Sequence, residues 1–255
     1  MWFGNKQTPP IVWVIKTTVL LSVVFFFAPI DALSQKRFSK TYPASQNVRL
    51  QLLNRSGSVT VEGWTRNEIQ IIADLEKPAA NIEPQNLSGT IVINLVRDNQ
   101  GRGEVGSVNF LIRIPYTAMV DIETMIGNLS ITSIRSGLVR AKITSEGDIT
   151  LTNIGSSAVS AENITGDIFF DGEIQDGGTY RFSSNKGNIN IRIPYESNFR
   201  LVATAPSSRN ISLGTFANSS MNYVGNGRRV VGNFGSGAAT ISATNQQGNI
   251  AFLRR

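Results

Sequence analysis

A short motif recurs along the chain at intervals of about 20 residues, and it constrains the fold more than any other feature. Residues 127–134 read Gly-Asn-Leu-Ser-Ile-Thr-Ser-Ile, and residues 147–154 read Gly-Asp-Ile-Thr-Leu-Thr-Asn-Ile. Further copies, some weaker, begin at Gly57, Gly89, Gly166, Gly187, Arg209 and Gly248. A unit of this size cannot bury a core alone, so the repeat predicts units that stack on one another.

Within each copy apolar residues alternate with Ser, Thr and Asn, which is the period of a β-strand. Gly followed by Asn or Asp is typical of a corner, because these residues tolerate a positive φ. The segment Ile-Arg-Ile-Pro-Tyr occurs at 112–116 and again at 191–195, close to four units later. We therefore predict an all-β fold over residues 48–255, a single-stranded, β-helix-like β-solenoid with coils of about 20 residues.

Residues 1–34 have the pattern of a signal peptide. Lys6 and Lys16 precede an apolar run of about 13 residues, which is short for a membrane span of ~20 residues. Ala32 and Ser34 are small residues that favour cleavage before Gln35. The alternative is an uncleaved anchor over residues 11–30. Both readings place the domain outside the cytoplasm, in the periplasm, in the cell envelope or secreted, and residues 35–47 are expected to be a linker or arm.

Composition excludes several kinds of chemistry. The chain has no Cys and no His, so the usual zinc sites and Ser-His-Asp or Cys-His catalysis are ruled out. The formal net charge is +6, and we interpret it as a mild basic bias spread along the chain that favours solubility. Such a bias also suits anionic glycans, lipid headgroups or nucleic acid. We expect no cofactor and no nucleic-acid partner.

The residue after each corner glycine forms the most suggestive column, which contains Asn128, Asp148, Asp167 and Asn188. If the coils are in register, Asp148 and Asp167 lie one strand spacing apart, where a bound Ca²⁺ would relieve their repulsion. Turn propensity alone also explains the column. We therefore predict no metal site and keep Asp148 and Asp167 as the candidate ligands.

Two other groups of charged residues are candidate sites. Asp167, Asp171, Glu173 and Asp176 are the densest acidic stretch, but no aromatic platform for a sugar flanks them, and we predict no catalytic residue. The pairs Arg228-Arg229 and Arg254-Arg255 are candidate contacts for a phosphate or an acidic glycan, but we expect them to be exposed, solubilising residues, with Arg254 and Arg255 near an end of the stack.

Three segments carry a family resemblance: Val59-Thr-Val-Glu-Gly-Trp64, the Arg-Ile-Pro at 113–115 and the serial Gly-Asn/Asp-Ile units. Over about residues 40–255 the chain resembles the bacterial exported "putative adhesin" domains of unknown function, and it is similar to the head domains called GIN. The resemblance implies a β-solenoid at the envelope or surface, and it supplies no catalytic residues.

The expected function is that of an exported, non-enzymatic module that binds an envelope or surface glycan or protein. One alternative is a polysaccharide lyase or hydrolase that uses Asp148, Asp167 or Asp171. Another is an envelope scaffold that associates with itself. Membrane contact is expected only if the N-terminal segment stays uncleaved.

Overall fold

The computed structural model describes residues 1–4, 36–45 and 47–255. The chain divides into two units, Met1–Ser34 and Gln35–Arg255, and the elements described below all belong to the second. Apart from residues 1–4, the predicted signal peptide lies outside the described residues. The described part contains no helix with the length and apolar character to cross a membrane.

The folded unit is all-β and consists of two long sheets. Within the described residues, sheet A has ten strands, in the spatial order β1 (Lys36–Pro43), β4 (Glu68–Leu75), β7 (Val108–Pro115), β3 (Val59–Trp64), β9 (Leu129–Thr132), β11 (Ile149–Ile154), β13 (Ile168–Gly172), β15 (Ile189–Ile193), β21 (Ile250–Arg254) and β17 (Ile211–Ser212). Sheet B has eleven, in the order β18 (Asn222–Val224), β19 (Arg229–Phe234), β16 (Phe199–Thr204), β20 (Ala239–Gln247), β14 (Thr179–Lys186), β12 (Ala158–Thr165), β10 (Val139–Glu146), β8 (Met119–Ile126), β2 (Arg49–Ser56), β6 (Thr90–Asn94) and β5 (Gln85–Leu87).

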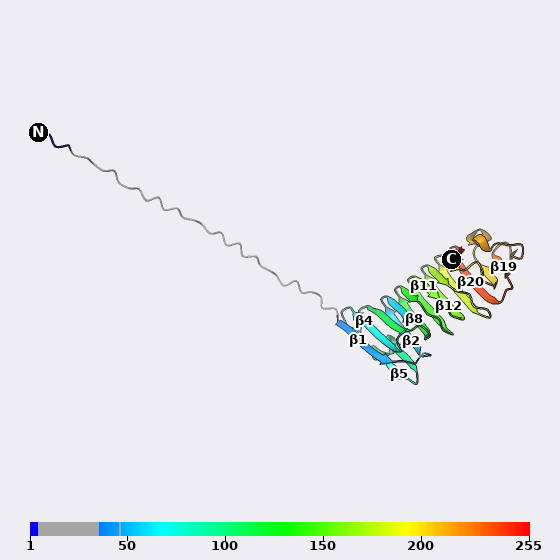
Figure 1. Ribbon diagram of the computed structural model, residues 1–255, viewed down its shortest axis with the longest axis horizontal. Helices are drawn as coiled ribbons and strands as arrows, with labels where there is room; N and C mark the ends of the chain where they lie inside the picture. Colours follow the sequence, from blue (N-terminus) through cyan, green and yellow to red (C-terminus); the bar gives the residue numbers. More distant parts are fainter. Residues whose placement is uncertain (5–35, 46) are drawn as a thin grey trace. The chain divides into compact units, whose positions relative to one another are not determined.

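Successive turns of the chain contribute one strand to each sheet, and we call such a pair of strands a coil. The strands β8 and β9 form one coil, and the next is β10 and β11. Neighbouring coils pair in parallel, as the ladder of strands in Figure 1 shows. The register puts aliphatic residues in one file, as the repeat predicted: Leu129, Ile149, Ile168, Ile189 and Ile250. These long parallel sheets are compatible with the predicted solenoid.

The hydrophobic core lies between the two sheets. Inward residues of each strand are buried, and they form one continuous apolar cluster. Across the core, the rings of Phe170 in β13 and Phe182 in β14 have centroids 5.1 Å apart. Stacking therefore buries a face that no single coil could bury, and this burial drives the fold.

The corner glycines are required by both backbone conformation and space. Gly147, Gly166 and Gly187 have φ values of 147°, 127° and 132°, which side-chain-bearing residues rarely adopt. A Cβ on Gly166 would collide with the carbonyl oxygen of Gly147 in the coil below. The early copy expected at Gly89 is wrong, because that glycine lies in the hairpin turn between β5 and β6, where no neighbour restricts it.

The order of coils in the stack differs from their order in the sequence. The last coil, β20 and β21, lies between the coil of β14 and β15 and the strands β16 and β17. The early strand β3 likewise lies between β7 and β9. The expectation that Arg254 and Arg255 lie near an end of the stack is therefore wrong, because β21 lies between β15 and β17. Arg254 packs over the ring of Tyr195 at 5.3 Å, and the Arg255 amide donates to the Ile193 carbonyl.

Most of the linker or arm expected at 35–47 is a strand. Residues 36–43 form β1, which pairs antiparallel with β4 at the edge of sheet A. Phe38 and Tyr42 pack against the core from this strand. The strand was not predicted because most of its residues are polar and only every fourth residue is aromatic.

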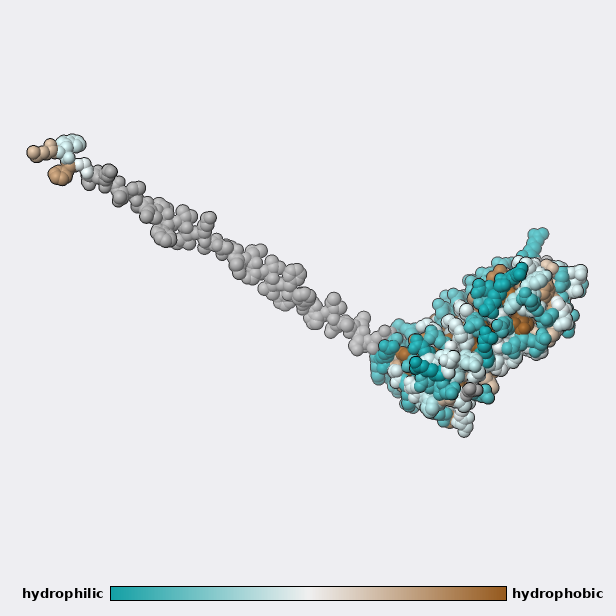
Figure 2. Space-filling model, in the orientation of Figure 1, coloured by the Kyte–Doolittle hydropathy of each residue, from teal (hydrophilic) through white to brown (hydrophobic). Residues whose placement is uncertain are grey.

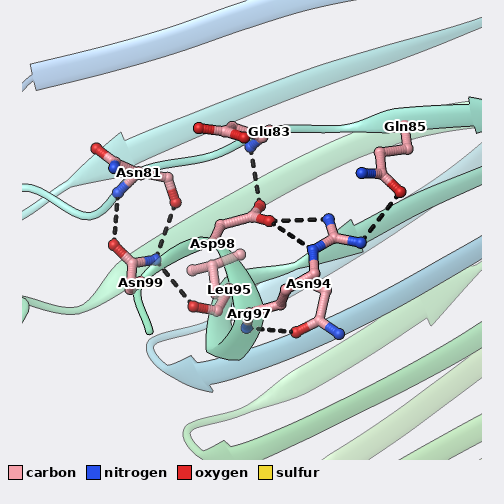
Figure 3. A network of polar contacts seen from close by, with 8 residues as sticks. All are labelled: Asn81, Glu83, Gln85, Asn94, Leu95, Arg97, Asp98 and Asn99. Carbon is pink, nitrogen blue, oxygen red and sulfur yellow. Dashed lines mark hydrogen bonds and ion pairs between the residues drawn. The ribbon is translucent and has the colours of Figure 1, made fainter. Parts of the chain in front are cut away.

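The first part of the stack is closed by a polar network around the short helix α1 (Leu95–Asp98), drawn in Figure 3. The Asn99 side chain donates to the carbonyls of Asn81 and Leu95, and it accepts from the Asn81 amide. The Asp98 carboxylate, whose side chain is 1% exposed, accepts from the Glu83 amide and pairs with Arg97. These bonds hold the loop at 76–84 against buried Leu95, so the network covers apolar residues and is structural.

The other end is closed by aromatic rings. Phe216, in the 3₁₀ turn Gly214–Phe216, is fully buried among Phe199, Phe234 and Phe252, with ring centroids 5.1–6.2 Å away. Aromatic pairs at such separations add stability beyond the area they bury. This cluster joins the last coil, through Phe252, to β19, through Phe234.

Candidate binding surfaces

The column after the corner glycines forms a ladder of hydrogen bonds along one corner of the stack. Asn128 Oδ1 accepts from the Asp148 amide at 3.0 Å, and Asp148 Oδ1 accepts from the Asp167 amide at 2.7 Å. Asp167 Oδ1 accepts from the Asn188 amide at 2.7 Å, and Asn188 Oδ1 from the Asn249 amide at 3.1 Å. The stack thus brings the two candidate metal ligands onto adjacent coils and gives each carboxylate a backbone donor.

This ladder accounts for the column without a ligand. A backbone N–H stabilises a carboxylate and holds two like charges in neighbouring coils. In the part of the chain that the structure describes, no group of three or more His, Cys, Asp or Glu is placed to hold a metal ion. Asp148 and Asp167 are corner residues whose carboxylates accept backbone N–H groups of the next coil.

A second ladder, which the sequence analysis missed, lies inside the same corner. Asn54, Asn163 and Asn245 are buried, and each donates from Nδ2 to a corner-glycine carbonyl, at 3.4, 2.8 and 2.7 Å. Each lies three residues before a corner glycine. An amide at an otherwise apolar, inward position was the signal that could have revealed the ladder.

The acidic stretch at 167–176 does not converge on one site. Asp171 lies on the outer side of sheet A but is only 4% exposed, because Arg192 pairs with it at 2.7 Å and Arg255 at 3.6 Å. The hydrogen bond from Arg192 to Asp171 raises the pKa of the Arg192 guanidinium above its usual value. Glu173 pairs with Arg135 at 3.4 Å. These carboxylates are engaged in ion pairs that fasten the C-terminal strand and the turns.

The outer side of sheet B is where charge is distributed unevenly. In its first half, basic and acidic side chains are paired. Asp121 is bonded by Arg49 at 2.8 Å and by Arg140 at 2.7 Å, and Lys142 pairs with Glu123 at 3.3 Å. Such pairs cancel each other's field, so this half presents little net charge.

The second half of sheet B, formed by β14, β20, β16 and β19, has a different surface, which we call the basic face. Its outward residues are Thr179, Arg181, Ser183, Arg200, Val202, Thr204, Arg229, Val231, Asn233, Thr240, Ser242 and Thr244. Arg181, Arg200 and Arg229 are exposed, and among the described residues none of them has an ion-pair partner. The visible side of the folded unit in Figure 2 is largely hydrophilic, with only small apolar spots.

The basic face follows from the composition of the C-terminal third. Residues 177–255 carry nine Lys and Arg but a single acidic residue, Glu196. The basic bias is therefore concentrated, and the expectation that it is spread along the chain is wrong. The register places hydroxyls between the cations, since Arg181 lies beside Ser242 and Arg200 beside Thr240.

Comparison with known proteins locates the chain in a family. The model of the family described as Toastrack DUF4097 matches residues 41–252. A solved structure of a "putative cell adhesion protein" from Clostridium sporogenes is 13% identical, with a TM-score of 0.46, over 86% of this chain and 99% of that one.

A "putative adhesin" from Bacteroides fragilis is 10% identical, with a TM-score of 0.38, over 88% of this chain and 99% of that one. A "putative lipid binding protein" from Parabacteroides distasonis is 9% identical, with a TM-score of 0.32, over 86% of this chain and 97% of that one. None of the curated proteins matches this sequence. Because the family model covers nearly the whole folded unit, the chain belongs to the Toastrack DUF4097 family.

Proposed function

We propose that this protein is an exported β-solenoid that binds a component of the cell envelope or surface and catalyses no reaction. The observation that carries the proposal is the pair of long sheets, whose outer sides present many polar and charged side chains in fixed register. Many such side chains in fixed register make weak contacts that add up along an extended ligand.

Export is supported by the N-terminal sequence. Lys6 and Lys16, the apolar run and the small residues before Gln35 form the pattern of a secretory signal. A chain without cysteine needs no oxidative folding outside the cytoplasm, and here stability comes from core burial and parallel pairing.

A binding role is favoured over a lyase or hydrolase by the state of the carboxylates. Asp148 and Asp167 accept backbone N–H groups, and Asp171 is held between two arginines. A paired-carboxylate mechanism needs two groups that face a substrate across a cleft. In this structure the same groups are used to stabilise the stack.

Binding to isolated envelopes tests the proposal. Purified full-length protein, labelled at its N-terminus, is incubated with washed envelopes from the source cells, and bound protein is measured after sedimentation. We expect saturable retention that heat-unfolded protein does not show. Absence of retention would contradict the proposal, and release of new sugar ends from the envelopes would identify an enzyme instead. Concentration-dependent oligomers without retention would favour the self-associating scaffold.

A further inference from the structure

The basic face differs from the first half of sheet B because its strands carry arginines and no carboxylates. Residues 48–176 carry most of the acidic groups of the chain, and on sheet B their Arg49 and Arg140 are both paired with Asp121. The strands β14, β20, β16 and β19 contain no acidic residue at all. An exposed arginine without a carboxylate keeps its attraction for an external anion, whereas a paired one has already satisfied it.

The order of the strands spaces the cations across the face. Arg181 in β14 and Arg200 in β16 are separated by β20, which at the usual strand spacing puts their strands about 10 Å apart. Arg229 follows on β19, which pairs with β16. Between them, Thr240, Ser242 and Thr244 of β20 present hydroxyls that donate and accept hydrogen bonds. The surface thus alternates positive charge with hydroxyl groups.

We propose that the basic face binds an anionic polysaccharide, with Arg181, Arg200 and Arg229 contacting its acidic groups and the hydroxyls of β20 contacting its sugar hydroxyls. The inference rests on the proposed function and gives its ligand a chemical class. Repeated acidic groups on an extended chain match cations at fixed spacing, and each contact adds to the same binding event. Affinity should fall with salt, because the contacts are exposed.

Two other polyanions fit the face less well. Single-stranded nucleic acid is held by stacking its bases on aromatic rings, and the outward positions of these four strands carry none. Peripheral membrane binding needs bulky apolar side chains that enter the acyl boundary. The apolar outward residues here, Val202 and Val231, are small and half-buried.

Polygalacturonate is a suitable probe, because its methyl ester has the same sugar chain without the charge. Binding of both polymers to the full-length protein is measured by isothermal titration at 50 mM and 500 mM NaCl. The variant Arg181→Ala/Arg200→Ala removes two cations from the face. The control Arg66→Ala/Arg102→Ala removes two exposed cations elsewhere, so both variants change the net charge equally. Circular dichroism checks that both remain folded.

We expect polygalacturonate to bind at 50 mM NaCl, the ester not to bind, and 500 mM NaCl to abolish binding. The face variant should bind about tenfold more weakly, and the control should match the unaltered protein. Equal loss in both variants would overturn the inference, and so would binding of the ester or no binding at low salt. Tighter binding to single-stranded DNA or to vesicles with anionic lipid would also overturn it. Retention of the face variant on envelopes would show that the proposed function holds while this site fails.

Discussion

At the scale of single residues, the corner at Gly166 is fixed by three positions that act together. The glycine allows close approach of the next coil, the following Asn or Asp accepts the neighbouring amide, and an inward Asn three residues earlier bonds the glycine carbonyl. For Gly166 the backbone conformation and the missing Cβ are both needed. The corner is thus specified by polar satisfaction as well as by turn propensity.

Replacing Gly166 by alanine should destabilise the protein by about 2–4 kcal/mol. The positive φ costs about 1–2 kcal/mol for a residue with a Cβ, and the collision with the Gly147 carbonyl adds strain. Gly137 is the matched control, because it has open space around it and no positive φ. Gly137→Ala should change stability by less than about 0.5 kcal/mol. Equal effects of the two substitutions in chemical denaturation would contradict the corner argument.

The buried Tyr180 hydroxyl should make stability depend on pH in the alkaline range. Burial raises the pKa of Tyr180 above its usual value. The hydrogen bond from the Gln175 amide lowers this pKa by less than burial raises it, and the nearby Glu173 charge raises it slightly more. The unfolded chain therefore ionises first. The contribution of the neutral Tyr180 hydroxyl to stability is complete below about pH 10, and it is lost as pH rises through the folded-state pKa of Tyr180.

The variant Tyr180→Phe separates this effect from other groups. At neutral pH it should lose about 1–3 kcal/mol, because the Ser156 carbonyl and the Gln175 amide lose their partner. Above pH 10 the difference between variant and unaltered protein should shrink, since the variant has no phenol to ionise. Melting temperatures at pH 7 to 11 measure it, and a difference that grows with pH would refute the assignment.

At the scale of elements, the C-terminal coil connects two parts of the stack, because each of its strands lies in the interior of a sheet. The strand β20 lies between β14 and β16, and β21 lies between β15 and β17. Asp171 ties this coil to β13 through Arg255, and Arg192 shares the carboxylate. The strands β16 to β19 therefore depend on residues that follow them in the sequence.

Removing residues 239–255 should unfold more than the last coil. The truncation exposes the apolar faces of β14 to β17 and separates Phe199 from Phe252, which stack 6.0 Å apart. We expect the truncated chain to lose the protection of residues 197–238 against limited proteolysis, while a fragment that contains residues 47–193 persists. A truncated chain whose residues 197–238 resist protease as before would show that the inserted coil is dispensable.

At the scale of the whole molecule, part of the fold could be predicted from the sequence. The corner glycines and alternating residues predicted the parallel coils and the file of Leu129, Ile149, Ile168 and Ile189, because each coil repeats the same local chemistry. The order of coils could not be predicted, since a strand such as β21 carries the same pattern wherever it inserts. The strand β1 was missed because its pairing with β4 is long-range.

The candidate surface was only partly readable for the same reason. The lack of acidic residues after Glu196 is visible in the sequence, but it was averaged into a net charge. Knowing which arginines are free requires the register, because Arg140 and Arg181 lie in one outward row and only Arg140 meets a carboxylate. Charge asymmetry along a sequence is therefore a better indicator of a binding face than total charge.

Hydrogen exchange at the C-terminus tests the central claim most directly, since the basic face is continuous only if β20 lies between β14 and β16. The amides of residues 241–244 and 250–251 should exchange as slowly as those of β12 and β14, in the middle of the stack, because these segments have a paired strand on both sides. Exchange within seconds, as in a frayed chain end, would contradict the insertion of this coil and with it the surface built on it.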